Sequence, residues 1–266
     1  MPSRYLSSVA RLVVAVSLAV ATSACDVVVG GLHARETAKD TWQRSFQLAE
    51  GGRFELVNQN GRIEVEAVDG DTIEVVAERS AGAPTIDEAK DLLKQVEIQA
   101  EVTAGLVKIT TKAPKSFGRQ HANVKYQVKV PRLTVVWLTN TNGVVKVNGV
   151  KGAVHAESTN GTVAAVGVGG EVEARTTNGS VEVEVDQVTG EGVRLETTNG
   201  SIELRMPRTV KADLRASAVN GGVHTTDLEV ESSREGTRRR IEGRLNGGGA
   251  PIEATTVNGG IRLVGK

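Results

Sequence analysis

Hydrophobic and polar residues alternate along much of the chain after its first 45 residues, with the period of a half-buried β-strand. In "RIEVEA", Ile63 and Val65 alternate with Glu64 and Glu66. The segment "VKYQVKV" repeats this pattern, and Pro131 then ends it. We therefore expect a protein built mainly from short amphipathic strands.

One segment breaks this alternation and predicts a short helix. In "PTIDEAKDLLKQ", Thr85 is followed three residues later by Glu88, the spacing of a capping box that satisfies free backbone N–H groups. Ala89, Leu92 and Leu93 then form an apolar face. We expect this helix to cover an edge or an end of the sheet.

From Leu133 onward, the sequence repeats a turn of the form Asn-Gly. The spacing between successive asparagines is 18, 18, 21 and 21 residues, and a charged insertion precedes the last copy. A nearly fixed period of this length indicates a repeat architecture. The repeated turn residues are Asn142, Gly143, Asn160, Gly161, Asn178, Gly179, Asn199, Gly200, Asn220, Gly221, Asn258 and Gly259.

Each period, such as "NGTVAAVGVGGEVEARTT", contains two short strands and two corners. Two all-β folds fit this plan. In a β-solenoid, each period is one coil of a parallel stack. In an antiparallel β-sandwich, each Asn-Gly is a hairpin turn. The periodic identity of the corners favours the solenoid-like stack of two-strand repeats, because stacked coils must match their neighbours, and the sandwich is the alternative.

We interpret the Asn-Gly series as a structural turn ladder. Both residues tolerate positive φ, and stacked asparagine amides can hydrogen-bond from coil to coil. A repeated ion site is the competing interpretation, but calcium-binding β-rolls use aspartate at such turns. We expect the open ends of the stack to be capped by the helix near Thr85 and by the terminal strand from Ile261 to Val264.

The first residues, "MPSRYLSSVARLVVAVSLAVATSAC", predict a signal peptide over residues 1–24. Its apolar stretch is shorter than the ~20 residues of a membrane-spanning helix. Cys25 follows Thr22-Ser23-Ala24, which resembles a bacterial lipobox, although Thr22 stands where leucine is preferred. We expect Cys25 to be lipidated, and ordinary cleavage before an incidental cysteine is the alternative.

Two further segments complete the expected organisation. Residues 25–45 are predicted to be a lipidated tether with a short helix near "ARETAKDTWQ", and residues 46–266 to be the repeat domain.

Composition excludes several classes of function. Lysine and arginine total 32, as do aspartate and glutamate, so the chain lacks the basic excess of a dedicated nucleic-acid binder. A single cysteine excludes an internal disulfide and a cysteine-rich metal site. Aromatic residues are only 3% of the chain, so aliphatic residues must fill the core.

Few residues suggest catalysis or metal binding. Acidic rows on strands can hydrolyse glycosides, but they are more commonly the solvated face of a sheet; the candidates are Glu182, Glu184, Glu196 and Glu203. No two histidines stand at metal-ligand spacing, although His155 and His224 can approach each other across coils; the others are His33 and His121. We predict no catalytic residue, no metal and no cofactor.

Exposed aromatic rings and arginine clusters are the remaining candidates for binding. Tyr126 and Trp137 lie within strands and are expected in the core, whereas Phe117 is expected at the surface. The segment "SSREGTRRRIEG" is either a patch for an acidic polymer or a solvated excursion between two strands.

The segments "FELVNQNGRIEVEAVDGDTIEV", "TNTNGVVKVNGVKGAVHAESTNGTVAAVGVGGEVEARTTNGSVEVEV" and "LETTNGSIELRMP" resemble the bacterial putative-adhesin family, a domain of unknown function found in envelope proteins and lipoproteins. The resemblance covers residues 46–266. It implies a right-handed β-solenoid-like fold and a role in surface interaction, and it transfers no catalytic residue.

The sequence thus predicts a lipid-anchored, non-enzymatic protein of the bacterial cell envelope, facing the periplasm or the exterior. Its β-solenoid surface is expected to serve adhesion or interaction with an unknown envelope protein or surface polymer. The expected partners also include the membrane, through the N-terminal lipid, and exclude nucleic acid. A polysaccharide-active β-helix enzyme and an envelope regulatory or sensor component are the alternatives.

Overall fold

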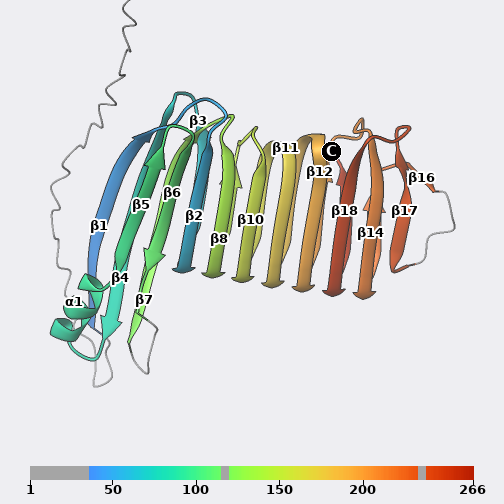
Figure 1. The fold of residues 1–266 in the computed structure, drawn as a ribbon. Coiled ribbons are helices and arrows are strands. Elements are labelled where there is room, and N and C mark those ends of the chain that lie inside the picture. The colour runs from blue at the N-terminus through green and yellow to red at the C-terminus, as the bar shows by residue number, and fades with distance from the viewer. Residues whose placement is uncertain (1–35, 115–119, 233–237) are drawn as a thin grey trace, which may run out of the picture.

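A computed structural model of the chain describes residues 36–114, 120–232 and 238–266. These residues form a long stack of β-strands with helix α1 (Ile86–Lys94) at one end (Figure 1). The stack has two faces, which we call the first and the second sheet. The predicted all-β fold with one short helix is confirmed.

The first sheet contains the strand of each coil that leads into an Asn-Gly corner. Its central strands, from β6 to β14, run parallel. In spatial order it consists of β5 (Glu97–Thr103), β6 (Leu106–Lys112), β2 (Arg53–Asn60), β8 (Val135–Asn142), β10 (Val154–Asn160), β11 (Val163–Asn178), β12 (Val181–Asn199), β18 (Ala250–Asn258), β14 (Ala212–Asn220), β17 (Arg240–Leu245) and β16 (Val230–Ser232).

The second sheet contains the strands that leave the corners. The long strands β11 and β12 belong to both sheets, because their pairing shifts register between Ala165 and Val172. In spatial order the second sheet consists of β1 (Glu36–Gln47), β4 (Thr72–Ala83), β7 (His121–Pro131), β3 (Ile63–Val68), β9 (Val145–Asn148), the first parts of β11 and β12, β13 (Ile202–Met206), β19 (Ile261–Gly265) and β15 (Val223–Thr226).

The corners are stacked in register, as a solenoid requires. Asn160 lies opposite Asn142 on one side and opposite Asn178 on the other, in parallel pairs. Within the described ranges, antiparallel pairing is confined to the two ends of the stack. The solenoid-like stack is therefore confirmed, and the antiparallel sandwich is wrong.

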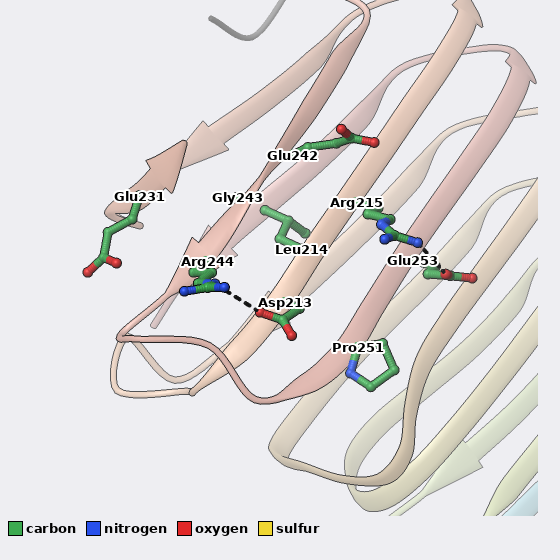
Figure 2. Close-up of a pocket in the computed structure, with 9 residues that line it drawn as sticks. All are labelled: Asp213, Leu214, Arg215, Glu231, Glu242, Gly243, Arg244, Pro251 and Glu253. Carbon is green, nitrogen blue, oxygen red and sulfur yellow. Dashed lines mark ion pairs between the residues drawn. The ribbon is translucent and has the colours of Figure 1, made fainter. Parts of the chain in front are cut away.

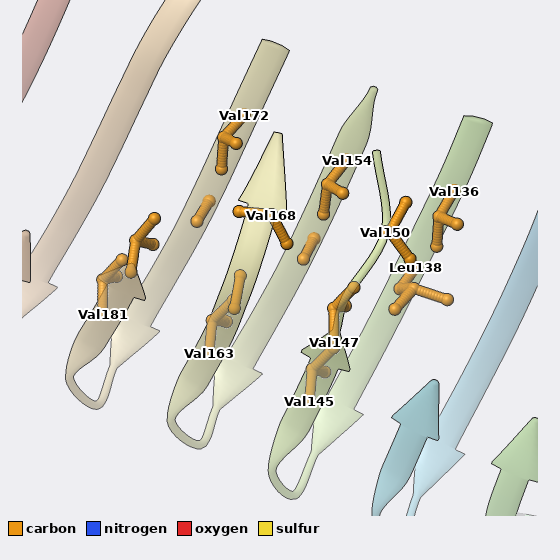
Figure 3. Close-up of a cluster of buried hydrophobic side chains, with 14 of the residues drawn as sticks. Val136, Leu138, Val145, Val147, Val150, Val154, Val163, Val168, Val172 and Val181 are labelled. Atoms are coloured by element: carbon orange, nitrogen blue, oxygen red, sulfur yellow. The ribbon is translucent and has the colours of Figure 1, made fainter. Parts of the chain in front are cut away.

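The core is a thin layer of aliphatic side chains between the two sheets. Alternate residues such as Val145, Val147 and Val163 point inward and are fully buried (Figure 3). Tyr126 is buried near the helical end of the stack, where its hydroxyl lies 2.6 Å from the Thr111 hydroxyl. Burial raises the pKa of Tyr126 to about 12. Its ring is thus part of the core, as the sequence predicted.

Helix α1 begins and packs as predicted. The Thr85 side chain accepts a hydrogen bond from the Glu88 backbone N–H at 3.3 Å, which fixes the first turn. The buried residues Ala89, Leu92 and Leu93 pack against small side chains of β1 and β4. In the described part of the chain, no helix is long and apolar enough to cross a membrane.

The spatial order of the coils differs from the chain order at the C-terminal end. The last coil, β18 and β19, lies between β12–β13 and β14–β15 rather than at the end (Figure 1). The expectation that the strand from Ile261 to Val264 caps the stack is therefore wrong. The antiparallel pair β17–β16 lies beyond β14 instead.

The segment predicted to be a tether with a short helix contains a strand. Residues 36–47 form β1, which pairs antiparallel with β4 along its whole length, so the folded sheet begins ten residues before residue 46. Because β1 is an edge strand, backbone pairing stabilises it and only Ala38 is fully buried. The period-two hydrophobic signal is weak for that reason.

Candidate functional site

The asparagine side chains at the corners form one continuous hydrogen-bonded ladder. Asn160 Nδ2 donates to Asn142 Oδ1 at 2.8 Å, and Asn178 Nδ2 donates to Asn160 Oδ1 at 2.8 Å. The same contact is repeated at every step between neighbouring coils. In spatial order the ladder consists of Asn60, Asn142, Asn160, Asn178, Asn199, Asn258 and Asn220. Asn60 extends the ladder by one coil beyond the predicted set.

A second ladder lies directly inside the first and was not predicted. The residue two positions before each corner asparagine is buried and, at six coils, donates to the backbone of the preceding coil. For example, Thr176 Oγ1 donates to the Gly161 carbonyl at 2.8 Å. The donors are Asn58, Asn140, Ser158, Thr176, Thr197 and Thr256. The sequence contained a signal for this ladder, because a polar residue recurs two positions before the corner asparagine at six of the seven coils.

The corner glycines are required by the close approach of neighbouring coils. A Cβ on Gly161 would lie 2.1 Å from the Gly143 carbonyl oxygen, and one on Gly200 would lie 1.9 Å from that of Gly179. Four of the seven corner glycines, among them Gly143 at φ 132° and Gly179 at φ 157°, have positive φ, whereas Gly161 and Gly200 do not, and no ladder asparagine has positive φ. The conformational reason for the Asn-Gly turn therefore holds for the glycine at these four corners and not for the asparagine, and the close approach of the coils is a second reason for glycine.

The four candidate carboxylates do not form one site. Glu182, Glu184 and Glu203 project from the second sheet, whereas Glu196 belongs to the part of β12 in the first sheet. Glu203 lies 2.6 Å from Arg205, and the Lys266 ammonium donates a hydrogen bond to the Glu184 carboxylate, which raises the pKa of Lys266. A glycosidase needs a pair of carboxyl groups that flank the bond to be cleaved, and Glu196 lies in the opposite sheet from the other three carboxylates, so the four cannot act together.

The histidines are also separated. His155 lies on β10 in the first sheet, and His224 lies on β15 in the second, near the far end of the stack. Among the residues that the structure describes, no cluster of three or more His, Cys, Asp or Glu side chains is arranged to hold a metal ion. Cys25, His33, Phe117 and Arg234 lie outside the described residues.

A shallow pocket of about 660 Å³ lies on the outer side of the first sheet, near β14, β17 and β18 (Figure 2). Arg244 lies 3.8 Å from Asp213, and Arg215 lies 3.9 Å from Glu253. Glu231 and Glu242 complete its charged lining. Because its two arginines already face carboxylates, this pocket provides no isolated positive charge for an anionic ligand.

The clearest unexplained feature of the first sheet is an apolar row at the start of β8. It is formed by Leu133, which lies two residues before the strand, and by Val135 and Trp137. We call these three residues the β8 row. Leu133 is 51% exposed and Trp137 is 43% exposed. Tryptophan is highly buried on average, so an exposed one on a flat sheet is informative. The prediction that Trp137 lies in the core is wrong.

The Trp137 ring is held between side chains of the two neighbouring coils. It stacks on the His155 ring at a centroid distance of 4.1 Å, and the Arg53 guanidinium lies 5.7 Å from the centroid of the Trp137 ring. His155 Nδ1 in turn lies 3.0 Å from a Glu173 carboxylate oxygen. These contacts fix the ring in one orientation before any partner arrives.

The sequence contained a signal for this row. In "LTVVWLTN", apolar residues occupy both the odd and the even positions of the strand. Because these two sets point to opposite faces, one apolar set must face outward. Val136 and Leu138 point inward and are buried, which leaves the other parity on the surface. An ordinary amphipathic strand would have polar residues there.

Comparison with known proteins agrees with this architecture. The family model Toastrack DUF4097 matches residues 54–264. No curated protein matches the chain. A "putative cell adhesion protein" from Clostridium sporogenes is similar in structure, with a TM-score of 0.51 and 12% identity over 85% of this chain and 100% of the other. At this identity, the similarity supports the fold alone.

Two other solved structures are more distant. A "putative adhesin" from Bacteroides fragilis has a TM-score of 0.30 and 14% identity, over 85% of this chain and 97% of the other. A "putative lipid binding protein" from Parabacteroides distasonis has a TM-score of 0.28 and 11% identity, again over 85% and 97%. Scores this low carry no functional argument.

Proposed function

Starting from the fact that this chain belongs to the Toastrack DUF4097 family, we propose that it is a lipid-anchored, non-enzymatic component of the bacterial cell envelope that binds a partner protein through the β8 row. The exposed β8 row, and Trp137 in particular, is the observation that carries the proposal. Tryptophan and arginine are the residue types most enriched at energetic hot spots of protein interfaces.

The surroundings of the β8 row support a protein partner. Arg53 lies 3.0 Å from Glu55, and Glu173 contacts His155, so charged groups surround an apolar centre and are already paired with each other. An apolar centre with a polar rim is the usual anatomy of a protein interface. The stacked rings add preorganisation, which lowers the entropy lost on binding.

The anchor in this proposal is Cys25. The signal-like sequence before it and its lipobox-like setting support lipidation, and two acyl chains give stable membrane attachment where one gives only marginal binding. Growth with an alkyne fatty acid should label the wild-type protein and leave Cys25→Ser unlabelled. An unlabelled wild-type protein would remove the anchor from the proposal and leave the β8 row unaffected.

Substitution of Trp137 should abolish partner capture without unfolding the protein. We expect Trp137→Ala to reduce the crosslinked partner recovered from native membranes by more than about tenfold, since hot-spot truncations cost about 2 kcal/mol or more. The measurement is crosslinking pull-down read by quantitative mass spectrometry, with circular dichroism as the test of folding.

Thr139→Ala is the matched control, because Thr139 is exposed on the same strand and points to the same side as Trp137. It should leave capture unchanged. Equal capture of the same proteins by wild type and by folded Trp137→Ala would refute the proposed binding surface.

A further inference from the structure

The corner edge of the stack carries no charged residue along its interior, from the corner of Asn142 to that of Asn258, although Arg62 and Arg238 lie beside the corners at its two ends. Each ladder asparagine forms a triplet with the residue before it and the glycine after it. We call these seven triplets together the corner ridge. In spatial order these triplets are Gln59-Asn60-Gly61, Thr141-Asn142-Gly143, Thr159-Asn160-Gly161, Thr177-Asn178-Gly179, Thr198-Asn199-Gly200, Val257-Asn258-Gly259 and Val219-Asn220-Gly221. Charged residues make up 24% of the chain, yet none occurs here.

The neighbouring surfaces are different. On the first sheet, the register aligns Glu173, Arg194, Glu253 and Arg215 across four adjacent strands. Arg194 lies 2.7 Å from Glu253 in this row. The second sheet likewise carries Glu182, Glu203 and Arg262 in one register row. The neutrality of the corner ridge is therefore a property of that edge and not of the whole surface.

Each ladder amide has hydrogen-bonding capacity left over. An asparagine side chain has two N–H groups and two carbonyl lone pairs. An interior member such as Asn178 uses one N–H toward Asn160 and one lone pair toward Asn199. One donor and one acceptor per coil therefore remain for a ligand, and the exposed side chain of Asn178 presents them to solvent.

The residues before the asparagines add hydroxyl groups to this array. Thr159 and Thr177 are exposed, and their hydroxyls make no hydrogen bond to another described residue. Figure 1 shows the first-sheet strands that carry them ending side by side along one edge. Since neighbouring strands are spaced by ~4.8 Å, the same set of groups recurs at a constant interval.

From this arrangement we infer that the corner ridge binds a neutral polysaccharide chain lying along the stack. A ligand that meets the same donor and acceptor at each coil is best matched by a polymer that repeats. Sugar hydroxyls both donate and accept, as the spare amide and threonine groups require. Val257 and Val219 offer apolar contacts to the C–H faces of sugar rings at one end.

The charge pattern selects among polymers. From the corner of Asn142 to that of Asn258, the corner ridge has no cation to attract a sulfated or carboxylated glycan, and it has no charge that a neutral polymer would have to desolvate. A protein partner that is not itself a stack of repeats does not present one group at constant spacing over seven coils. This inference goes beyond the partner contact proposed at the β8 row and does not depend on it.

The test uses the full chain purified in detergent and sedimented with insoluble cellulose or chitin. We expect wild type to bind at least one of these neutral polymers and to bind heparin–agarose at least tenfold less. Thr177→Lys places a charge at the centre of the corner ridge and should reduce binding at least tenfold, because that charge must be desolvated on contact.

Thr255→Lys is the matched control. Thr255 is exposed on the outer face of β18 and lies two residues before the corner ridge. It should bind like wild type, and both variants should keep the wild-type circular dichroism spectrum and melting temperature. The inference is overturned by wild type that binds neither neutral polymer, by equal binding to heparin, or by unimpaired binding of Thr177→Lys.

Discussion

Gly200→Ala is expected to destabilise the protein by about 3–5 kcal/mol, at the upper end of single-substitution effects. A Cβ at this position would lie 1.9 Å from the Gly179 carbonyl oxygen, a contact that real structures do not contain. Relief requires two coils to separate. That separation would strain the hydrogen bonds that join these two coils, from the Gly179 N–H to the Asn199 carbonyl, at 3.0 Å, and from Thr197 Oγ1 to the Gly179 carbonyl, at 2.9 Å.

Thermal unfolding checks this result. A chain of this size loses roughly 2–4 °C per kcal/mol, so the melting temperature should fall by roughly 10 °C. Gly105→Ala is the matched control, because a Cβ there would meet nothing within 4 Å and the backbone is not left-handed. It should melt within about 2 °C of wild type. If Gly200→Ala also melts within about 2 °C of wild type, the coils can separate at little cost in free energy.

The corners were predictable from sequence because stacking imposes the same steric and hydrogen-bonding demand on every coil. A step of the ladder needs an amide at the asparagine, no Cβ at the glycine and a small donor two residues before, as at Thr197, Asn199 and Gly200. These demands repeat in the sequence at the period of the coil. Period and composition therefore identified the fold.

The neighbour of each coil was not predictable in the same way. All seven coils carry the same corner asparagine, so the asparagine ladder alone does not distinguish the coil of Asn258 from that of Asn220 as the neighbour of Asn199. The sequence period shows that each coil stacks on another coil, but it does not identify which coil is the neighbour. Connections and end strands decide the order, and the pairing of β17 with the outer side of β14 leaves the last coil inside.

The candidate site was missed because its residues resemble core residues. Trp137 has a high strand propensity and lies among valines and leucine, so composition alone places it inside. Its exposure follows only from knowing which alternate positions of β8 face the core. Val136 and Leu138 are buried, so Trp137 between them faces outward. The stacking of Trp137 on His155 is even harder to predict from sequence, because it depends on the register of β8 against β10.

The inserted position of the last coil makes a second prediction with a large effect. Removal of residues 250–266 should open the stack from within rather than shorten it. It deletes β18, which pairs with both β12 and β14, and β19, which pairs with both β13 and β15. The buried side chains of Ile252, Ile261 and Leu263 are lost with them. The coil of β14 and β15 then has no parallel neighbour.

Hydrogen exchange read by mass spectrometry measures this outcome strand by strand. In the shortened chain, amides of β14 and β15 should exchange as in an unfolded chain, while those of β8 and β10 keep their protection, because a stack of repeats is stabilised by nearest neighbours. The full chain, measured in parallel, should protect both regions. Retained protection of β14 would mean that its coil docks directly onto β12 and β13. The matching ladders would then be sufficient to join any two coils, and the observed order would rest on the connections alone.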